Sequence, residues 1–171
     1  MEQPKSVLTE VAEGTYDAAD MPFDFVAEGM ETALLCEADP AGREKLAEAV
    51  RSLGYRVTEA ASARDALKKA RFHVFDLVVV NELFDTDSPE ANDVLTYFSS
   101  LPMVTRRRMF VVLVTERFRT MDNMAAFNKS VNLTLNVKNV EDAAAIIKKG
   151  VADHSAFYHV FKETLKKMGR L

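Results

Sequence analysis

Several polar residues of this 171-residue chain stand directly after short apolar runs. Glu37 and Asp39 follow the run TALLC, Asn81 follows LVVV, Thr115 ends FVVLVT, and Lys138 follows a later run. Carboxylate oxygens can bind a hard cation such as Mg²⁺ or act as nucleophiles, whereas the neutral amide of asparagine is a poor nucleophile. The identity of residue 81 therefore decides which chemistry such a set of side chains could perform.

The elements that would position these residues alternate between strand and helix patterns. Continuous apolar or alternating runs predict strands at 32–37, 55–60, 77–80, 110–115 and 133–137. Helix patterns lie between them, at 40–53, 62–71, 89–100 and 120–130, and a last helix begins near Val140. Asp39 before Pro40 and Ser62 before an apolar stripe are the expected N-caps.

Strands that alternate with helices form right-handed βαβ crossovers onto a parallel sheet. Five such units predict an α/β, flavodoxin-like (βα)5 doubly wound domain with strand order 2-1-3-4-5. In such a sheet the carboxyl ends of the strands form the functional edge. The polar residues named above would all gather at that edge.

Residues 32–150 resemble the receiver domain of two-component response regulators, the CheY-like family. The order and spacing of the elements carry this resemblance, together with GYRVTEAASARDAL (54–67), which is very similar to the family's second strand and helix. The resemblance implies an acidic cluster after strand 1 and a phosphorylated aspartate after strand 3, which together hold Mg²⁺. It also implies a Thr or Ser after strand 4 and a Lys after strand 5 that contact the phosphoryl group.

The chain departs from that pattern where the phosphorylation chemistry would occur. The acidic motif reads Glu37-Ala38-Asp39, without its middle acid, and Asn81 stands at the phosphoacceptor position. An amide cannot replace the anionic nucleophile, and Mg²⁺ would lose two carboxylate ligands. We therefore expect a degenerate phosphorylation pocket and no bound metal or cofactor.

Three further positions follow from the same resemblance. Thr115 and Lys138 match the family's hydroxyl and lysine, and Leu135 stands where an aromatic residue usually moves with the phosphorylation-linked switch. Since the pocket has lost carboxylates, Glu37 becomes the natural partner of Lys138. We expect a Glu37–Lys138 ion pair that fixes the pocket in one state.

These features predict a non-enzymatic pseudo-receiver, a phosphorylation-independent protein-interaction module in bacterial signal transduction. Its unidentified protein partner would bind the face made by helix 4, strand 5 and helix 5, or the C-terminal helix, and a homodimer is possible. One alternative is an active receiver that uses a displaced acid such as Asp39 or Asp85. A second is a small flavodoxin-like nucleotide-binding protein, although the chain has no glycine-rich phosphate-binding motif.

Composition and charge limit the partners and the cellular compartment that we expect for the protein. The formal net charge of −4 gives no reason to expect attraction to nucleic acids or membranes. A single cysteine, Cys36, excludes an internal disulfide, and the three scattered histidines do not have zinc-ligand spacing. We expect a cytoplasmic protein.

The two ends of the chain differ from the body. Residues 1–29 contain seven acids and one lysine, so we expect an irregular acidic arm in which MPFDFV (21–26) packs against the domain or a partner. The body would span 30–150, and 151–171 would form a helical extension with an apolar stripe at alternating spacings of four and three residues. Gly150 could break this last helix and let its second half fold back. The stripe consists of Ile147, Val151, His154, Tyr158, Phe161, Leu165 and Met168.

Overall fold

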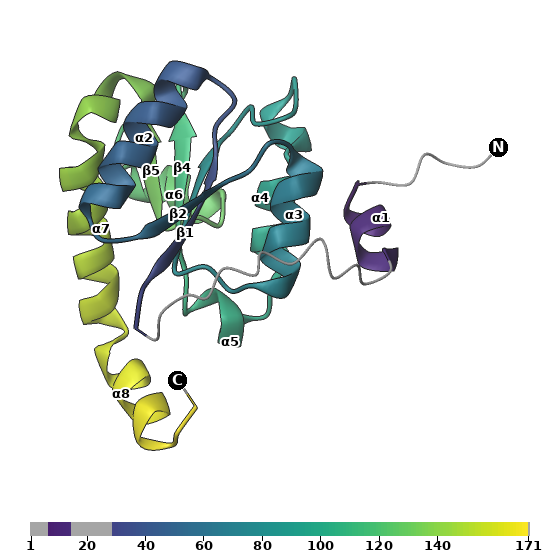
Figure 1. The fold of residues 1–171 in the computed structure, drawn as a ribbon. Helices are drawn as coiled ribbons and strands as arrows, with labels where there is room; N and C mark the ends of the chain where they lie inside the picture. Colours follow the sequence, from purple (N-terminus) through teal and green to yellow (C-terminus); the bar gives the residue numbers. More distant parts are fainter. Residues whose placement is uncertain (1–6, 15–28, 171) are drawn as a thin grey trace.

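The computed structural model describes residues 7–14 and 29–170, and its centre is a five-stranded parallel sheet (Figure 1). The strand order β2-β1-β3-β4-β5 confirms the predicted doubly wound fold. Each apolar run predicted as a strand forms one, because β-branched and apolar residues suit a sheet covered on both faces. The strands are β1 (Thr32–Cys36), β2 (Arg56–Glu59), β3 (Leu77–Asn81), β4 (Phe110–Thr115) and β5 (Leu133–Asn136).

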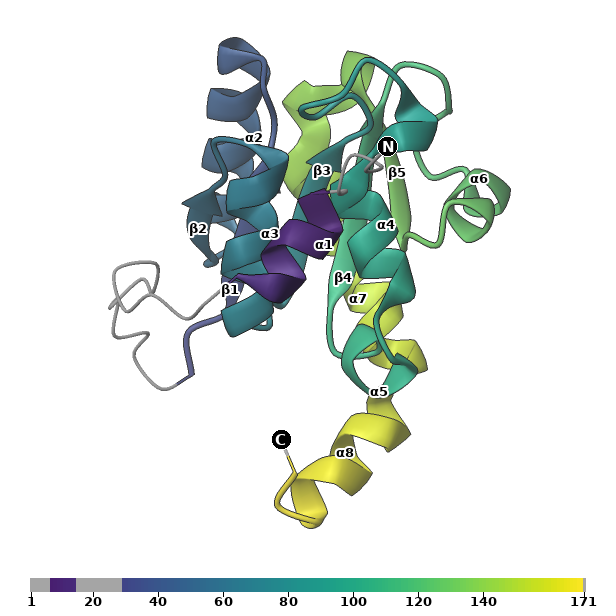
Figure 2. The ribbon, with the colours of Figure 1, turned by 90° about the vertical axis from the view of Figure 1, so that its right-hand side faces the viewer.

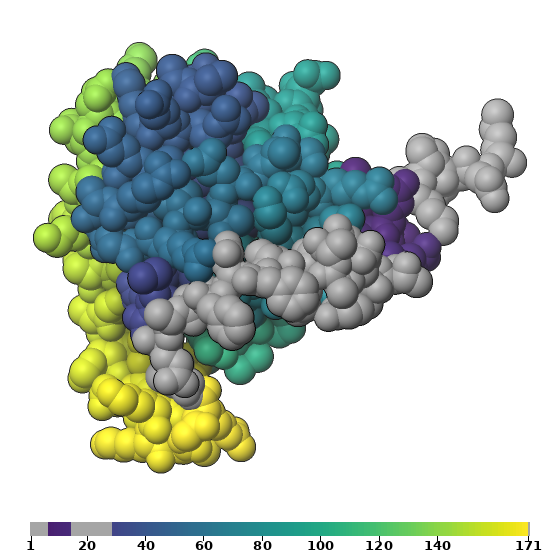
Figure 3. Space-filling model, viewed as in Figure 1, coloured from purple at the N-terminus to yellow at the C-terminus, as the bar shows by residue number. Residues whose placement is uncertain are grey.

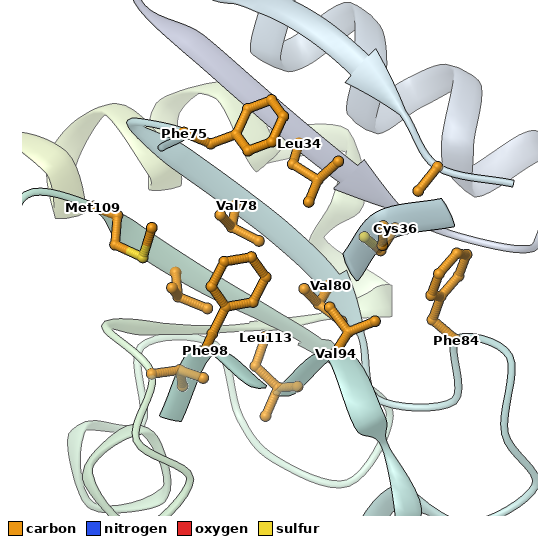
Figure 4. Close-up of a cluster of buried hydrophobic side chains, with 14 of the residues drawn as sticks. Leu34, Cys36, Phe75, Val78, Val80, Phe84, Val94, Phe98, Met109 and Leu113 are labelled. Carbon is orange, nitrogen blue, oxygen red and sulfur yellow. The ribbon is translucent and has the colours of Figure 1, made fainter. Parts of the chain in front are cut away.

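Helices cover both faces of the sheet and enclose two apolar clusters. On one face α2 (Pro40–Ser52) and α7 (Ala143–Phe157) pack through Leu46, Val50 and Ile147. On the other face, α3 (Ala63–Phe72), α4 (Asp93–Ser100) and α6 (Asn123–Asn128) contribute to a second cluster, whose core includes Phe98 and Leu113 (Figure 4). The remaining elements are short: η2 (Pro89–Ala91), α5 (Met103–Arg106) and η3 (Val137–Asp142).

Side-chain caps begin the helices where the sequence predicts them. The Asp39 carboxylate accepts the N–H of Gly42 at 2.7 Å, and Pro40 occupies the first turn of α2. The Ser62 hydroxyl accepts the N–H of Asp65 at 3.1 Å. These caps satisfy backbone donors that have no partner within the helix, and so they fix where each helix starts at the edge of the sheet.

The predicted irregular arm is only partly correct, because residues Val7–Glu13 form the helix α1 (Figure 2). Val11 is buried against the body, and the Arg71 guanidinium donates to the carbonyl of Val11 and, at 3.3 Å, to that of Gly14. Arg64 lies 3.5 Å from Glu10. Arg71 therefore binds the carbonyl end of the acidic helix, and Arg64 pairs with one of its acidic side chains. The MPFDFV segment lies outside the described residues.

The last part of the chain consists of two helices instead of one continuous helix. Helix α7 runs through Gly150, where an added Cβ would lie 2.8 Å from Cζ of Phe110, so the glycine allows close packing on β4 and does not break the helix. The predicted boundary at residue 150 thus falls inside α7. The direction changes at Tyr158, and α8 (His159–Lys167) then projects beyond the sheet (Figure 3).

His154 occupies the junction between α7, β4 and α8. Its ring lies edge-on to Phe110, with centroids 5.4 Å apart, and against Tyr158 at 4.8 Å. Within the described part of the chain its Nε2 atom is buried without a hydrogen-bond partner. Burial, reinforced by the charges of Lys162 and Arg106, lowers the pKa of His154 to about 4.

We expect the protein to lose stability between pH 6.5 and pH 4 through His154. The unfolded chain protonates this imidazole near pH 6.5 and the folded chain only near pH 4, so the unfolded state binds more protons in this window. The loss should be about 1–3 kcal/mol after allowance for the ring's partial exposure, with no further loss from this group below pH 4. Chemical denaturation across this range should show a smaller pH dependence for His154→Phe than for the wild type.

The matched control is the exposed His159, whose replacement by glutamine should leave the pH dependence unchanged. Equal pH dependence of the wild type and His154→Phe would contradict the assignment.

Candidate functional site

The carboxyl ends of β1 and β3 bring Glu37 and Asn81 together, as the sequence predicts. The Asn81 Nδ2 atom donates to Glu37 Oε2 at 2.7 Å, and the second oxygen of Glu37 accepts the N–H of Asp39 at 3.0 Å. Asn81 Oδ1 accepts the N–H of Leu83 at 2.9 Å. Both functional atoms of the Asn81 amide are therefore engaged, one by a carboxylate and one by the backbone.

The Glu37–Asn81 contact depends on residue 81 being an amide. A carboxylate at the same position would place two anionic oxygens at hydrogen-bonding distance, and such a pair cannot keep both charges at low cost. The amide instead donates a charge-assisted hydrogen bond to the buried Glu37. Among the described residues, there is no group of three His, Cys, Asp or Glu side chains placed to hold a metal ion.

Two exposed acids near this edge, Asp39 and Asp85, are engaged at helix starts. Asp39 caps α2, and Asp85 Oδ2 accepts the N–H of Ala63 at 2.8 Å at the start of α3. Ala38 lines a hollow beside Asn81, which is described below, and contributes no polar side chain to it. Neither Asp39 nor Asp85 takes the place of a carboxylate at position 81 in this geometry.

The predicted Glu37–Lys138 pair is wrong, and Lys138 does not belong to the pocket. Strand β5 ends at Asn136, and the following turn directs Val137 toward the hollow that Glu37 and Asn81 line. Lys138 is exposed, and its backbone N–H donates to Asn136 Oδ1 at 3.0 Å. An apolar side chain thus stands where the resemblance implied a lysine.

The predicted switch-face position, Leu135, is also wrong, because this side chain is completely buried between the sheet and α7. Side chains alternate along a strand, so Leu133 and Leu135 point to the same face and Thr134 points to the other. The buried Thr134 hydroxyl donates to the carbonyl of Arg119 at 2.8 Å and accepts the N–H of Asp122 at 2.9 Å. It therefore ties β5 to the start of α6.

The most connected residue of the site, Glu82, was not among the residues predicted from the sequence. Its side chain is buried, and it accepts the Thr115 hydroxyl at 2.6 Å, the N–H of Glu116 at 3.2 Å and Nε–H of Arg117 at 2.9 Å. Thr115 is thus at the edge as predicted, but its hydroxyl faces Glu82 and not Asn81. An acid directly after a buried strand, together with an arginine two residues after Thr115, was the available signal.

We define the Glu82 network as Glu82, Asn92, Thr115 and Arg117. It joins the ends of β3 and β4 to the start of α4. The buried Asn92 amide donates to the carbonyls of Asn81 and Glu82 at 3.2 and 3.0 Å while its oxygen caps α4. Arg117 also donates to Glu90 at 3.2 Å. The hydrogen bond that Arg117 donates to Glu82 raises the pKa of Arg117, and the one that Arg117 donates to Glu90 lowers the pKa of Glu90.

A hollow of about 250 Å³ opens over the Glu37–Asn81 hydrogen bond and the side of the Glu82 network. Its lining includes the acids Glu37, Glu82 and Glu116, the cation Arg117 and the apolar Val137. The two buried carboxylates are both already hydrogen-bonded by the protein. Neither of these two carboxylates is therefore a free nucleophile or a free metal ligand.

An exposed apolar surface lies beside this edge, on α6. The helix turns Ala125 and Ala126 inward and leaves Met124 and Phe127 largely in water, 68% and 77% exposed. Met121 precedes the helix and is also exposed. We call Met121, Met124 and Phe127 the α6 patch. Exposed large apolar side chains that cluster in this way mark interaction sites.

Comparison with solved structures places the fold among receiver domains. A response regulator from Chloroflexus aurantiacus J-10-fl superposes with a TM-score of 0.58 and 20% identity over 71% of this chain and 98% of its own. The chemotaxis response regulator CheY4 of Vibrio cholerae gives 0.55 and 17%, with the same coverage of both chains. A CheY-like receiver domain protein from Methanospirillum hungatei JF-1 gives 0.57 and 17% over 74% of this chain and 98% of its own.

No protein-family model and no curated protein sequence matches this chain. The structural likeness at these identities establishes a CheY-like receiver fold.

We expect Glu82→Gln to lower the free energy of unfolding by about 1.5–3 kcal/mol, because it weakens three hydrogen bonds to a buried charged acceptor. The matched control is Glu90→Gln, which removes the exposed partner of the same arginine and should leave stability nearly unchanged. Urea unfolding of both variants measures the difference. Equal effects of the two substitutions would show that the Glu82 network does not stabilise the fold.

Proposed function

We propose that this protein is a phosphorylation-independent receiver-like module of two-component signalling that binds a protein partner in the cytoplasm. It is not an enzyme in this proposal. The observation that carries the proposal is the hydrogen bond from the Asn81 amide to Glu37, at the place where the fold family's phosphoacceptor stands. A group that is neutral, donating and already bonded does not attack phosphorus.

The second support is the position of the Thr115 hydroxyl. In a responsive receiver the corresponding hydroxyl contacts the phosphoryl oxygens, as the resemblance implies. Here it donates to the buried Glu82 carboxylate at 2.6 Å, and Arg117 and Glu116 hold the same carboxylate. The loop after β4 is therefore held by internal contacts, which favours one constant arrangement of α6 over a phosphate-dependent one.

The α6 patch is the candidate partner site within the predicted interaction face, which consists of α6, β5 and α7. Met124 and Phe127 are one helical turn apart, and both would lose contact with water in a complex. Flexible methionine side chains beside an aromatic ring suit a binding surface, because they adapt to a partner's shape. The constant arrangement of α6 would make such binding independent of phosphorylation.

An active receiver that uses Asp39 or Asp85 is the second candidate function. The closeness of both carboxylates to the edge favours it, whereas their engagement with the backbone of α2 and α3 opposes it. Beryllofluoride, which with Mg²⁺ mimics an aspartyl phosphate, separates the two functions. We expect ¹⁹F NMR to detect no bound beryllofluoride on the wild-type protein.

Uptake by the wild type that disappears in Asp39→Asn or Asp85→Asn would instead establish the active receiver and overturn our proposal. Asn81→Asp serves as the comparison, because it restores a carboxylate at the edge.

We expect Phe127→Ser to abolish capture of the partner from a lysate of the native cell, because it removes the most exposed ring of the α6 patch. The matched control is Phe157→Ser on α7, which removes an equally exposed ring at the other end of the molecule and should leave capture intact. Capture should also be the same with and without acetyl phosphate. If Phe157→Ser alone abolished capture, the partner site would instead lie on the C-terminal helices.

A further inference from the structure

The end of the molecule opposite the Glu37–Asn81 edge carries a second exposed apolar stripe. Phe157 at the end of α7, Val160 on α8 and Met168 directly after α8 are 80%, 76% and 57% exposed. Tyr158, Phe161 and Leu165, on the adjacent side, are half-buried. The helix α8 therefore turns one apolar side toward the body and presents another to the surroundings.

The rest of α8 and the residues after it are basic. Lys162, Lys166 and Lys167 on α8 and Arg170 after it stand against the single acid Glu163. A lysine-rich face beside a stripe of Phe, Val and Met, on a short helix, is typical of helices that lie in a membrane interface.

A second element extends this surface. Helix α5 exposes Met103 and Val104, and Arg107, directly after it, lies over the ring of Phe161 with its guanidinium carbon 5.4 Å from the ring centroid. The neighbouring Arg108 is exposed. Figure 2 shows α5 directly above α8 at this end of the molecule. We call Met103, Val104, Arg107, Arg108 and residues 157–170 the basic end.

We propose that the basic end binds the surface of an anionic phospholipid membrane, with the exposed stripe of α8 inserted at the level of the headgroups. Six cations and one acid give it an electrostatic attraction to anionic lipid, and its apolar side chains supply the insertion. The net charge of −4 is a sum over the whole chain and does not reveal this local excess of positive charge. The expectation of no membrane contact was based on that sum. No helix in residues 7–14 and 29–170 is long and apolar enough to span a bilayer.

Charge and shape favour a lipid surface over a second copy of the chain. A second copy would bring its own six cations against these six, and like charges so close repel. The stripe also lies on a projecting helix (Figure 3), which presents a convex ridge and not a groove. A flat anionic surface complements both properties. This proposal does not depend on the proposed function, and it leaves the α6 patch free for a partner.

Co-sedimentation of the full chain with vesicles tests the proposal. We expect binding to vesicles that contain phosphatidylglycerol, weakening with added salt, and no binding to phosphatidylcholine alone. Lys166→Gln and Lys167→Gln should each lower the partition coefficient about fivefold, which corresponds to about 1 kcal/mol per cation. The matched control is Lys138→Gln, which removes an exposed lysine at the opposite edge and should not change binding.

The double variant Phe157→Ser, Val160→Ser tests the insertion separately, and because both side chains are exposed the fold should persist, as circular dichroism can verify. It should lower vesicle binding by at least tenfold. Equal binding to the two vesicle types would overturn the proposal. So would unchanged vesicle binding of the double variant together with a change in its sedimentation coefficient, which would identify a protein interface instead.

Discussion

The buried carboxylate of Glu82 is the constraint around which the edge formed by the carboxyl ends of the strands is arranged. A charge removed from water must be met by donors, and here a hydroxyl, a backbone amide and a guanidinium all meet it. Two of these donors, Glu116 and Arg117, lie in the loop after β4, so satisfying the carboxylate also sets the path of that loop. Asn92 extends the same constraint to α4 through the carbonyls of Asn81 and Glu82.

This arrangement separates two functions that a receiver pocket normally combines. A responsive receiver needs an anionic acceptor and a hydroxyl that is free to contact the phosphoryl group. In this chain Asn81 has an amide whose nitrogen and oxygen are both hydrogen-bonded, and the Thr115 hydroxyl donates to the internal carboxylate of Glu82. The receiver-like fold is present, while these polar groups of the edge stabilise it through internal contacts.

The fold could be predicted from the sequence because the strands are apolar or alternating runs and the first helices of the sheet have local caps, such as Asp39 and Ser62. The placement of Glu37 and Asn81 at one edge followed from the strand order, but their hydrogen bond did not, because Lys138 was the expected partner of Glu37. Lys138 and Leu135 were misplaced because side chains alternate along β5, so a shift of one residue in where the strand ends reverses which side chains face the pocket. Glu82 was missed because its partners lie more than 30 residues later in the chain. Helix α1 was missed because its stability comes from Arg64 and Arg71, not from its own pattern.

The distribution of charge gives the molecule two ends with different chemistry. At the Glu37–Asn81 edge, the two buried acids, Glu37 and Glu82, are hydrogen-bonded within the protein, so their charges are not offered to an external ligand. At the basic end most of the cations are exposed and Glu163 is the only acid of α8, so their field extends into solution within a Debye length of about 8–10 Å. Buried and exposed charges contribute equally to a net charge, but only exposed charges attract an external partner strongly. The location of each charge, and not the sum of −4, therefore determines which partners the surface of this protein can bind.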